Sequence, residues 1–246
     1  MAETPLAARG HDPVVNADPG TVTVWSDIGC PWASLALHTL RAAAARRGGE
    51  LRVDHRAFPL ELFNRMPTPK HIVDAEIVVI GGYDATMGWR MWPGPDCAYP
   101  VTMLPAMEAV QAAKDPEVGG LSGSDELDAA LRDAFYAQGR CVSIPAVILE
   151  VAGQCAQVDA EALAHALAHG RGRAEVYRDW RTAQQEQVQG SPHLFTADGF
   201  EVHNPGVTYR WSNRPPTGFP RLLDYDAGWA EDLLDHLDRA ALPIPR

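Results

Sequence analysis

The stretch Thr21–Ser34 constrains the fold of this chain more than any other part of the sequence. Residues 21–26 alternate β-branched or aromatic residues with polar ones, which predicts a strand, and the following Ala/Leu-rich segment has the apolar spacing of a helix. Cys30 lies at the junction, and Pro31 takes the first helical position, where a missing N–H has no cost. The sequence therefore predicts that Cys30 is the N-cap of this helix.

The position of Cys30 predicts a reactive thiol. A side chain at a helix N-terminus faces unpaired backbone N–H groups and the positive end of the helix dipole, and both favour a thiolate. This effect lowers the pKa of a thiol modestly, and Asp27, three residues upstream, opposes it wherever its carboxylate comes close. Cys30 is the candidate nucleophile of the chain.

Composition and charge narrow the class of ligand. The 246 residues carry a formal net charge of -11, which argues against binding a nucleic acid or an anionic membrane through bulk electrostatics. The first twenty residues show no secretory signal, and no stretch resembles a membrane span. We therefore expect a cytoplasmic protein with reduced cysteines and a small neutral or thiol-bearing ligand.

The order of the remaining segments predicts an α/β frame with a helical block inside it. Residues 50–59 read as a second strand, parallel to the first, because a helix separates the two. Several helical patterns follow up to residue 189, and then a β-hairpin around Asp198-Gly199 and a final helix over residues 226–241. The aromatic and proline-rich piece 88–105 is either a wall over a pocket or a packed loop.

These pieces, taken in order, resemble the DsbA-like thioredoxin-fold proteins. Within them the chain is similar to the cytoplasmic FrnE-type branch, related to kappa-class glutathione transferases and 2-hydroxychromene-2-carboxylate isomerases. The resemblance covers residues 21–205 and implies a thioredoxin-like α/β fold interrupted by an α-helical insertion. The motifs that carry it are the first strand, Cys30-Pro-Trp-Ala33, the Phe58-Pro-Leu60 after the second strand, the helix Leu127–Arg140 and Gly190-Ser-Pro192 before the hairpin.

The resemblance divides the chain and assigns the site. We expect a loose leader over residues 1–19, a discontinuous thioredoxin-like domain over 20–64 and 176–246, and an α-helical insertion over 65–175. The resemblance puts the nucleophilic thiol at Cys30 and a cis-proline at Pro192. It also implies that Ser191 offers its backbone to an extended substrate or a thiol tripeptide.

Two further residues complete the expected substrate-binding set. We expect Trp32 both to shield the sulfur of Cys30 and to pack beneath the insertion. His193 begins the hairpin and either faces the site or caps a strand. His165 and His169 have the i, i+4 spacing of a metal-binding pair, but the sequence offers no third ligand, so we predict no metal site.

Ala33 is the main departure from the family pattern, because dithiol members have their second cysteine there. A disulfide within the motif is therefore impossible, and only an external thiol or a distant cysteine can resolve a mixed disulfide on Cys30. The distant candidates are Cys97, Cys141 and Cys155.

Three chemistries remain open for Cys30. The first is monothiol exchange with glutathione or mycothiol, as in a thiol-disulfide oxidoreductase. The second is a kappa-type transferase or isomerase role, in which Cys30 stabilises the thiolate of a bound thiol cofactor. The third is an inert cysteine in a protein that binds a hydrophobic small molecule or a partner. We expect the first, with no tightly bound cofactor, and the resemblance leaves a homodimer open.

Overall fold

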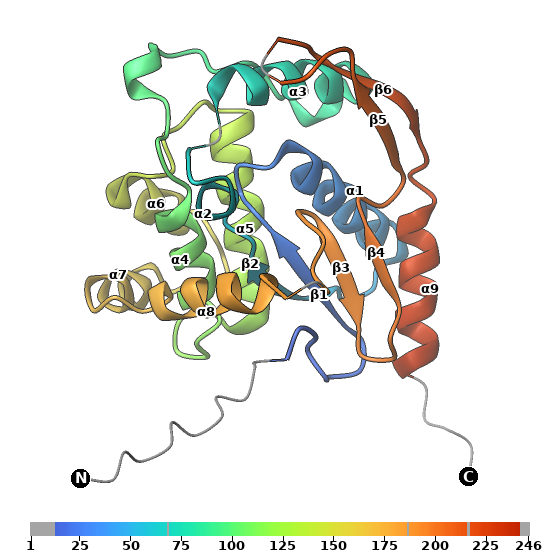
Figure 1. The fold of residues 1–246 in the computed structure, drawn as a ribbon. Helices are drawn as coiled ribbons and strands as arrows, with labels where there is room; N and C mark the ends of the chain where they lie inside the picture. Colours follow the sequence, from blue (N-terminus) through green and yellow to red (C-terminus); the bar gives the residue numbers. More distant parts are fainter. Residues whose placement is uncertain (1–12, 68, 186, 216, 242–246) are drawn as a thin grey trace, which may run out of the picture.

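A four-stranded sheet in the order β2-β1-β3-β4 forms the centre of the computed structural model (Figure 1). β1 pairs parallel with β2 and antiparallel with β3, and β4 pairs antiparallel with β3. The strands are β1 (Thr21–Ser26), β2 (Arg52–Ala57), β3 (His193–Thr196) and β4 (Glu201–His203). The structure describes residues 13–67, 69–185, 187–215 and 217–241.

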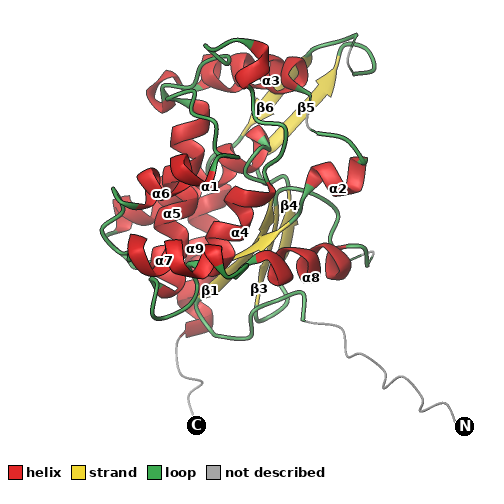
Figure 2. Ribbon diagram, turned by 90° about the vertical axis from the view of Figure 1, so that its left-hand side faces the viewer, coloured by secondary structure: helices red, strands yellow, loops and turns green. Residues whose placement is uncertain are grey.

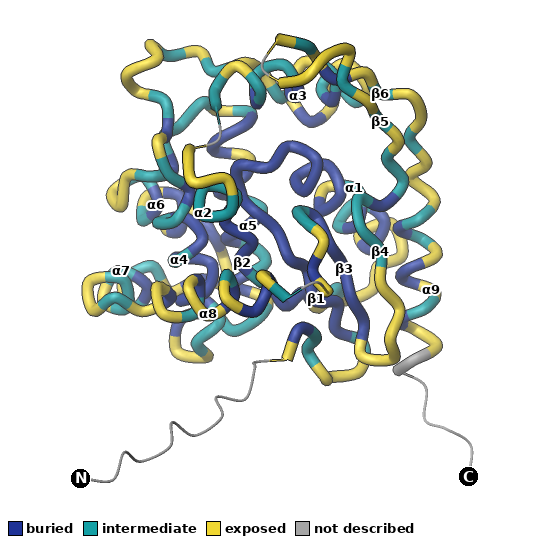
Figure 3. Tube along the Cα trace, in the orientation of Figure 1, coloured by how far each residue is buried: buried dark blue, intermediate teal, exposed yellow. Residues whose placement is uncertain are grey.

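Two helices, α1 (Pro31–Arg47) and α9 (Trp229–Ala241), pack on one face of this sheet. The alternation along β1 explains the arrangement, because Val22 and Val24 join the core beneath α1 and α9 while Trp25 packs with aromatic residues of another cluster. Figure 3 shows β1 and the adjoining part of α1 as buried chain. The predicted βαβ unit and the hairpin β3–β4 are confirmed.

The helical block between β2 and β3 has a core of its own, to which α4, α5, α6 and α7 contribute (Figure 2). α8 packs against both α4 and β2. The fold is thus thioredoxin-like with a helical insertion, as expected, whereas the exact boundaries at residues 64 and 176 stay a prediction. The elements are α2 (Leu60–Asn64), α3 (Lys70–Tyr83), the 3-10 helices η1 (Ala85–Met87) and η2 (Asp96–Ala98), α4 (Leu104–Ala112), α5 (Gly120–Tyr136), α6 (Pro145–Ala152), α7 (Ala160–Ala168) and α8 (Arg173–Ala183).

A second, two-stranded sheet lies beside α3, at the top of Figure 1. It consists of the antiparallel strands β5 (Val207–Trp211) and β6 (Pro220–Tyr225), which follow the thioredoxin-like hairpin directly. No strand is predicted from the sequence between the hairpin and the final helix. Both strands of this sheet are short and only half-buried, so neither shows the clear apolar alternation of β1.

The segment before β1 is more firmly held than a loose leader. Residues 1–12 lie outside the described residues, but Val14 is buried and its carbonyl accepts a hydrogen bond from Trp25 Nε1 at 2.9 Å. Asn16 donates its backbone N–H to Thr23 Oγ1 at 2.8 Å. These two bonds fix Val14 and Asn16 to the strand, whereas the expected leader over residues 1–19 as a whole stays a prediction.

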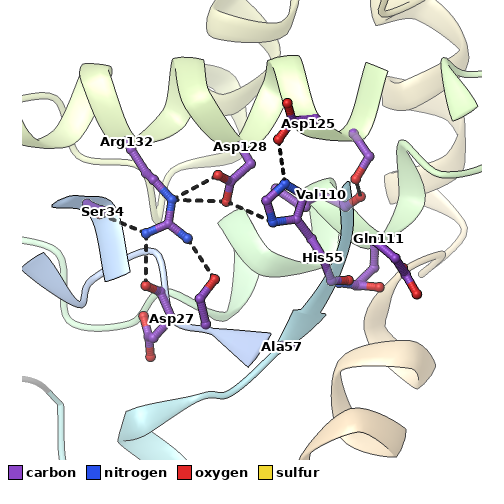
Figure 4. A network of polar contacts seen from close by, with 12 residues as sticks. Asp27, Ser34, His55, Ala57, Val110, Gln111, Asp125, Asp128 and Arg132 are labelled. Atoms are coloured by element: carbon purple, nitrogen blue, oxygen red, sulfur yellow. Dashed lines mark hydrogen bonds and ion pairs between the residues drawn. The ribbon is translucent and has the colours of Figure 1, made fainter. Parts of the chain in front are cut away.

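A buried network of charges fixes the insertion to the sheet (Figure 4). The Arg132 guanidinium, on α5, donates to Asp128 at 2.9 Å, to Ser34 Oγ at 2.7 Å and to Ser26 Oγ at 2.9 Å. It also donates to the backbone carbonyl of Asp27 at 3.1 Å. One side chain of the insertion thus holds the end of β1 and the first turns of α1 together.

Two further groups complete this network. Arg41 of α1 donates to Asp125 and Asp128 at 2.6 and 2.7 Å, and His55 of β2 lies 2.9 Å from Asp125. Burial alone raises the pKa of a carboxyl group, but Arg132, His55 and Arg41 outweigh it and hold the pKa of Asp128 well below its usual range. Both aspartates therefore stay ionised inside the protein.

The network predicts a large effect of Arg132→Met on stability. The substitution leaves the charge of Asp128 buried with fewer partners, so we expect the free energy of unfolding to fall by about 3–5 kcal/mol. Urea denaturation measures this change. Arg46→Met is the matched control, because the Arg46–Glu231 pair is exposed and contributes at most about 1 kcal/mol. Equal effects of the two substitutions would contradict the assignment.

Candidate active site

Cys30 is the N-cap of α1, as the sequence predicts. Its backbone is extended, with φ -90° and ψ 111°, and Pro31 begins the helix. The N–H of Cys30 binds the carbonyl of Asp27 at 3.1 Å, and its own carbonyl accepts the N–H of Ser34 at 3.1 Å. These bonds fix the sulfur at the carboxyl end of β1, where the strand turns into the helix.

The loop before β3 brings Ser191 against this thiol. Cys30 Sγ donates to the backbone carbonyl of Ser191 at 3.2 Å, and Ser191 Oγ accepts the backbone N–H of Asp27 at 2.9 Å. The Ser191–Pro192 peptide bond is cis, and Pro192 is buried. Two segments far apart in the sequence thus meet at the sulfur of Cys30.

Trp32 forms a wall of the site. Its ring stacks on Tyr209 of β5, with ring centroids 4.3 Å apart and planes at 20°. Its indole N–H donates to Glu76 Oε1 of α3 at 2.9 Å. Trp32 therefore joins α1, the insertion and the β5–β6 hairpin, and it lies in the same apolar cluster as Cys30.

His193 lies one residue beyond Pro192 but has other partners. Its Nδ1 accepts the backbone N–H of Gln189 at 3.2 Å, and its ring contacts those of Phe195 and His203. Burial lowers the pKa of His193 to about 4, so the ring is neutral. Its described contacts fix the loop that carries Ser191, and none is with Cys30.

The cover over Cys30 is apolar and nearly complete. The thiol belongs to a residue that is only 6% exposed. Residues from α1, α3, η1 and the β5–β6 hairpin contribute to the apolar cluster that contains Cys30. This cover cluster consists of Cys30, Trp32, Ala33, Leu35, Ile80 and Met87, with Leu60, Trp89, Val207, Tyr209, Leu222 and Tyr225 packed against it.

Burial reverses the expected effect on the thiol. Burial, together with the carboxylates of Glu76 and Asp27, raises the pKa of Cys30 to about 12. A helix N-terminus alone favours a lowered pKa, and this prediction is wrong for the closed site because burial outweighs the helix N-terminus. Cys30 is a protonated thiol here at neutral pH.

Glu76 is not among the site residues predicted from the sequence. Glu76 is 8% exposed, and burial raises its pKa to about 7 although the hydrogen bond from Trp32 lowers it. A single acidic residue on the apolar face of a predicted helix was the available signal, since Val73, Ile77 and Ile80 occupy the buried positions around it.

Other candidate groups lie elsewhere in the described structure. Cys97 is exposed in η2, Cys155 packs in the core of the insertion, and Cys141 contacts Ser143. None of the three belongs to the cover cluster. The described residues contain no group of three or more side chains able to hold a metal ion. Within the same residues, no helix has the length and apolar character to cross a membrane.

The cover predicts that Tyr209→Ala exposes the thiol. Loss of the ring stacked on Trp32 weakens the contact of the hairpin with α1, so we expect alkylation of Cys30 by iodoacetamide to accelerate about tenfold or more. Mass spectrometry of the Cys30 peptide gives the rate without interference from Cys97. Tyr177→Ala on α8 is the matched control, and the same rate in both variants would contradict the role of the stack.

The buried carboxyl groups predict how stability depends on pH. Burial raises the pKa of Glu76 to about 7 and that of Asp27 to about 6, both above their unfolded values. The contribution of these protonated carboxyl groups to stability is complete below the unfolded pKa. It is lost as the pH rises through the folded pKa, because the groups then ionise while buried. The free energy of unfolding should therefore fall, through these two groups, between about pH 4 and about pH 7.

Glu76→Gln tests this assignment by urea denaturation at two pH values. The free energy of unfolding of the variant, relative to that of the wild type, should rise by about 2–3 kcal/mol from about pH 5 to about pH 8, because glutamine does not ionise. Glu161→Gln, on the exposed side of α7, should show no such gain. If the free energies of unfolding of the wild type and Glu76→Gln differ by the same amount at both pH values, the buried-acid assignment is refuted.

Solved structures show which fold this site belongs to. The cytosolic disulfide reductase DsbM from Pseudomonas aeruginosa matches with a TM-score of 0.59 and 21% identity, over 89% of this chain and 100% of that chain. A structure of DsbM with GSH also matches, at 19% identity and a TM-score of 0.59, over 89% of this chain and 98% of that one. A probable DsbA oxidoreductase from Streptomyces coelicolor gives a TM-score of 0.59 at 21% identity, over 92% of this chain and 93% of that chain.

An isomerase shares the same architecture more distantly. The 2-hydroxychromene-2-carboxylate isomerase matches with a TM-score of 0.51 and 15% identity, over 74% of this chain and 87% of that chain. No protein-family model and no curated protein matches the sequence. The chain has the fold of the DsbA-like thioredoxin-fold proteins, which confirms at the level of fold the resemblance seen in the sequence.

Proposed function

We propose that this protein is a thiol oxidoreductase of DsbA-like type that works with the single cysteine Cys30. The contact between Cys30 Sγ and the Ser191 carbonyl, at 3.2 Å, is the observation that carries the proposal. It puts the only thiol of the site at a helix N-terminus and beside the backbone that precedes Pro192. In this position the sulfur can attack a disulfide while the neighbouring backbone orients the disulfide.

Ala33 determines the reaction sequence. Cys30 attacks one sulfur of a small disulfide, the bond between the two substrate sulfurs breaks, and a mixed disulfide forms as one substrate thiol leaves. A second thiol from solution then attacks the mixed disulfide, restores Cys30 and carries away the other half as a new disulfide. Glutathione or mycothiol is the cosubstrate we propose for this step, in a cytoplasm that keeps such thiols reduced.

The remaining site residues have separate roles in this proposal. Trp32 supplies the apolar wall against which the substrate rests, and Ser191 and Pro192 supply the backbone beside the attacked sulfur. His193 supports the loop through Gln189 and does not contact the substrate. Because Cys30 is almost fully covered, a substrate reaches its sulfur only when the β5–β6 hairpin shifts from Trp32.

A kappa-type transferase or isomerase role is the second candidate. The observation that favours it is the protonated state of Cys30, whose S–H already donates to a carbonyl oxygen. The same donor can stabilise the thiolate of a bound thiol cofactor without forming a covalent bond. The shared fold with 2-hydroxychromene-2-carboxylate isomerase is compatible with this role.

Reaction with a small disulfide separates the two functions. We expect 2-hydroxyethyl disulfide to form a mixed disulfide at Cys30 and glutathione to release it, with turnover followed through NADPH and glutathione reductase. Cys30→Ser and Cys30→Ala should both abolish turnover, since neither has a sulfur nucleophile. Cys97→Ser is the control and should retain it.

One result would rule out the oxidoreductase function, namely the failure of wild-type Cys30 to form any mixed disulfide. Thermal stabilisation by glutathione that persists in Cys30→Ser but is lost in Cys30→Ala would instead support the transferase role, because serine keeps a donor where alanine has none.

A further inference from the structure

Glu76 is a buried carboxylic acid in the wall of the Cys30 site, and the exchange reaction described above gives it no role. It lies on the inward face of α3 at 8% exposure. Its one described hydrogen bond is from Trp32 Nε1 to Oε1, at 2.9 Å. A carboxylate accepts about four hydrogen bonds, so most of its capacity is unused within the described residues. An acid with so few partners inside an apolar cluster suggests a chemical function.

The surrounding contacts place Glu76 in the wall of the Cys30 site, at the indole N–H of Trp32. Trp32, its hydrogen-bond donor, lies in the same first turn of α1 as Cys30. Ile80, one helical turn after Glu76 on the buried face of α3, belongs to the cluster around Cys30. After burial, Glu76 is also the largest contributor to the raised pKa of Cys30. Contacts and electrostatics therefore agree on its position.

Cys30 needs a proton acceptor in this environment. Its pKa of about 12 leaves almost no thiolate at neutral pH, yet only the thiolate attacks a disulfide. An efficient acid–base group has a pKa close to the working pH. Burial raises the pKa of Glu76 to about 7, so near neutral pH its carboxyl group is present in both protonation states.

The other titratable groups around Cys30 are less suitable as its proton acceptor. Both carboxylate oxygens of Asp27 already accept backbone N–H groups, from Gly29 at 2.7 Å and from Leu60 at 2.8 Å. Burial raises the pKa of Tyr209 to about 12 and that of Tyr136 well above its usual value, so both phenols stay protonated. Glu76 is the remaining carboxyl group with free acceptor capacity among the groups that interact with Cys30.

We propose that Glu76, from the helical insertion, is the catalytic acid and base for Cys30. The role rests on the oxidoreductase function proposed above. The Cys30 proton passes to the Glu76 carboxylate while the sulfur attacks the disulfide, the substrate S–S bond breaks and a Cys30–substrate disulfide forms. The departing thiolate takes the proton back from the Glu76 carboxylic acid and leaves as a neutral thiol. Atoms and charge balance without a further reagent.

The pH dependence of Glu76→Gln tests the proposal. We measure the rate of mixed-disulfide formation at Cys30 with 2-hydroxyethyl disulfide, by mass spectrometry, from about pH 5.5 to about pH 10.5. The wild-type rate should rise through an inflection near the pKa of Glu76, about 7. Glu76→Gln should lack this inflection and react about tenfold or more slowly near neutral pH. Near pH 10.5, where hydroxide removes the proton, the two rates should converge.

The substitution distinguishes a proton acceptor from a neighbouring charge. Glutamine keeps an oxygen for the Trp32 N–H but carries no charge, and loss of the Glu76 charge by itself lowers the pKa of Cys30 and accelerates the reaction. A Glu76→Gln rate equal to or above the wild-type rate near neutral pH overturns the proposal. Glu161→Gln is the control and should follow the wild-type profile.

A second variant keeps the acid and moves its pKa. Trp32→Phe removes the indole N–H that lowers the pKa of Glu76, so the inflection in the rate should move to higher pH. An unchanged inflection in Trp32→Phe counts against Glu76. A wild-type Cys30 that does not react at any pH overturns the oxidoreductase function itself, whereas normal reaction without any effect of Glu76→Gln overturns only the role of Glu76.

Discussion

The hydrogen bonds of the Arg132 guanidinium hold the two halves of this protein in one arrangement. Arg132 belongs to the helical insertion, but it binds Ser26 at the end of β1, the backbone of Asp27 and Ser34 of α1 (Figure 4). A buried cation needs an acidic partner, and Asp128 provides one from the preceding turn of α5. The turn that carries Cys30 is therefore fixed from the insertion as well as from the sheet.

Burial has opposite consequences for the groups around this turn. Asp125 and Asp128 face cations, so they stay ionised in the interior. Asp27, Glu76 and Cys30 are buried without a cation that outweighs desolvation, and burial raises the pKa of each. The ion pairs fix the insertion to the sheet, whereas the groups without such pairs form a buried site that holds a carboxyl group and a thiol. Such a pair of shifted groups is typical of functional sites.

The β5–β6 hairpin decides how the thiol is reached. Tyr209 covers the ring of Trp32, and Thr39 of α1 hydrogen-bonds to the hydroxyl of Tyr225. Both contacts join the hairpin to α1, the helix that Cys30 caps. The thioredoxin-like frame thus fixes the position of the sulfur, and an element outside the four-stranded sheet helps to cover it from solvent.

The sequence by itself determined the strand, turn and helix around Cys30, because β-branched alternation, Pro31 and the Ala/Leu periodicity are local signals. It also determined the absence of a second cysteine at Ala33 and, through the family resemblance, the thioredoxin-like class with its helical insertion. The helical pattern expected up to residue 189 ends instead at Ala183, and local periodicity gives no clear stop there.

Only the tertiary structure decided the chemical state of the site. The pKa of Cys30 depends on how many apolar groups exclude water from it, and these come from α3, η1 and the hairpin, far along the chain. Glu76 reaches the site because α3 packs against α1, a contact that no local pattern specifies. The candidate thiol is identified by the sequence, but desolvation and long-range contacts determine whether it holds its proton.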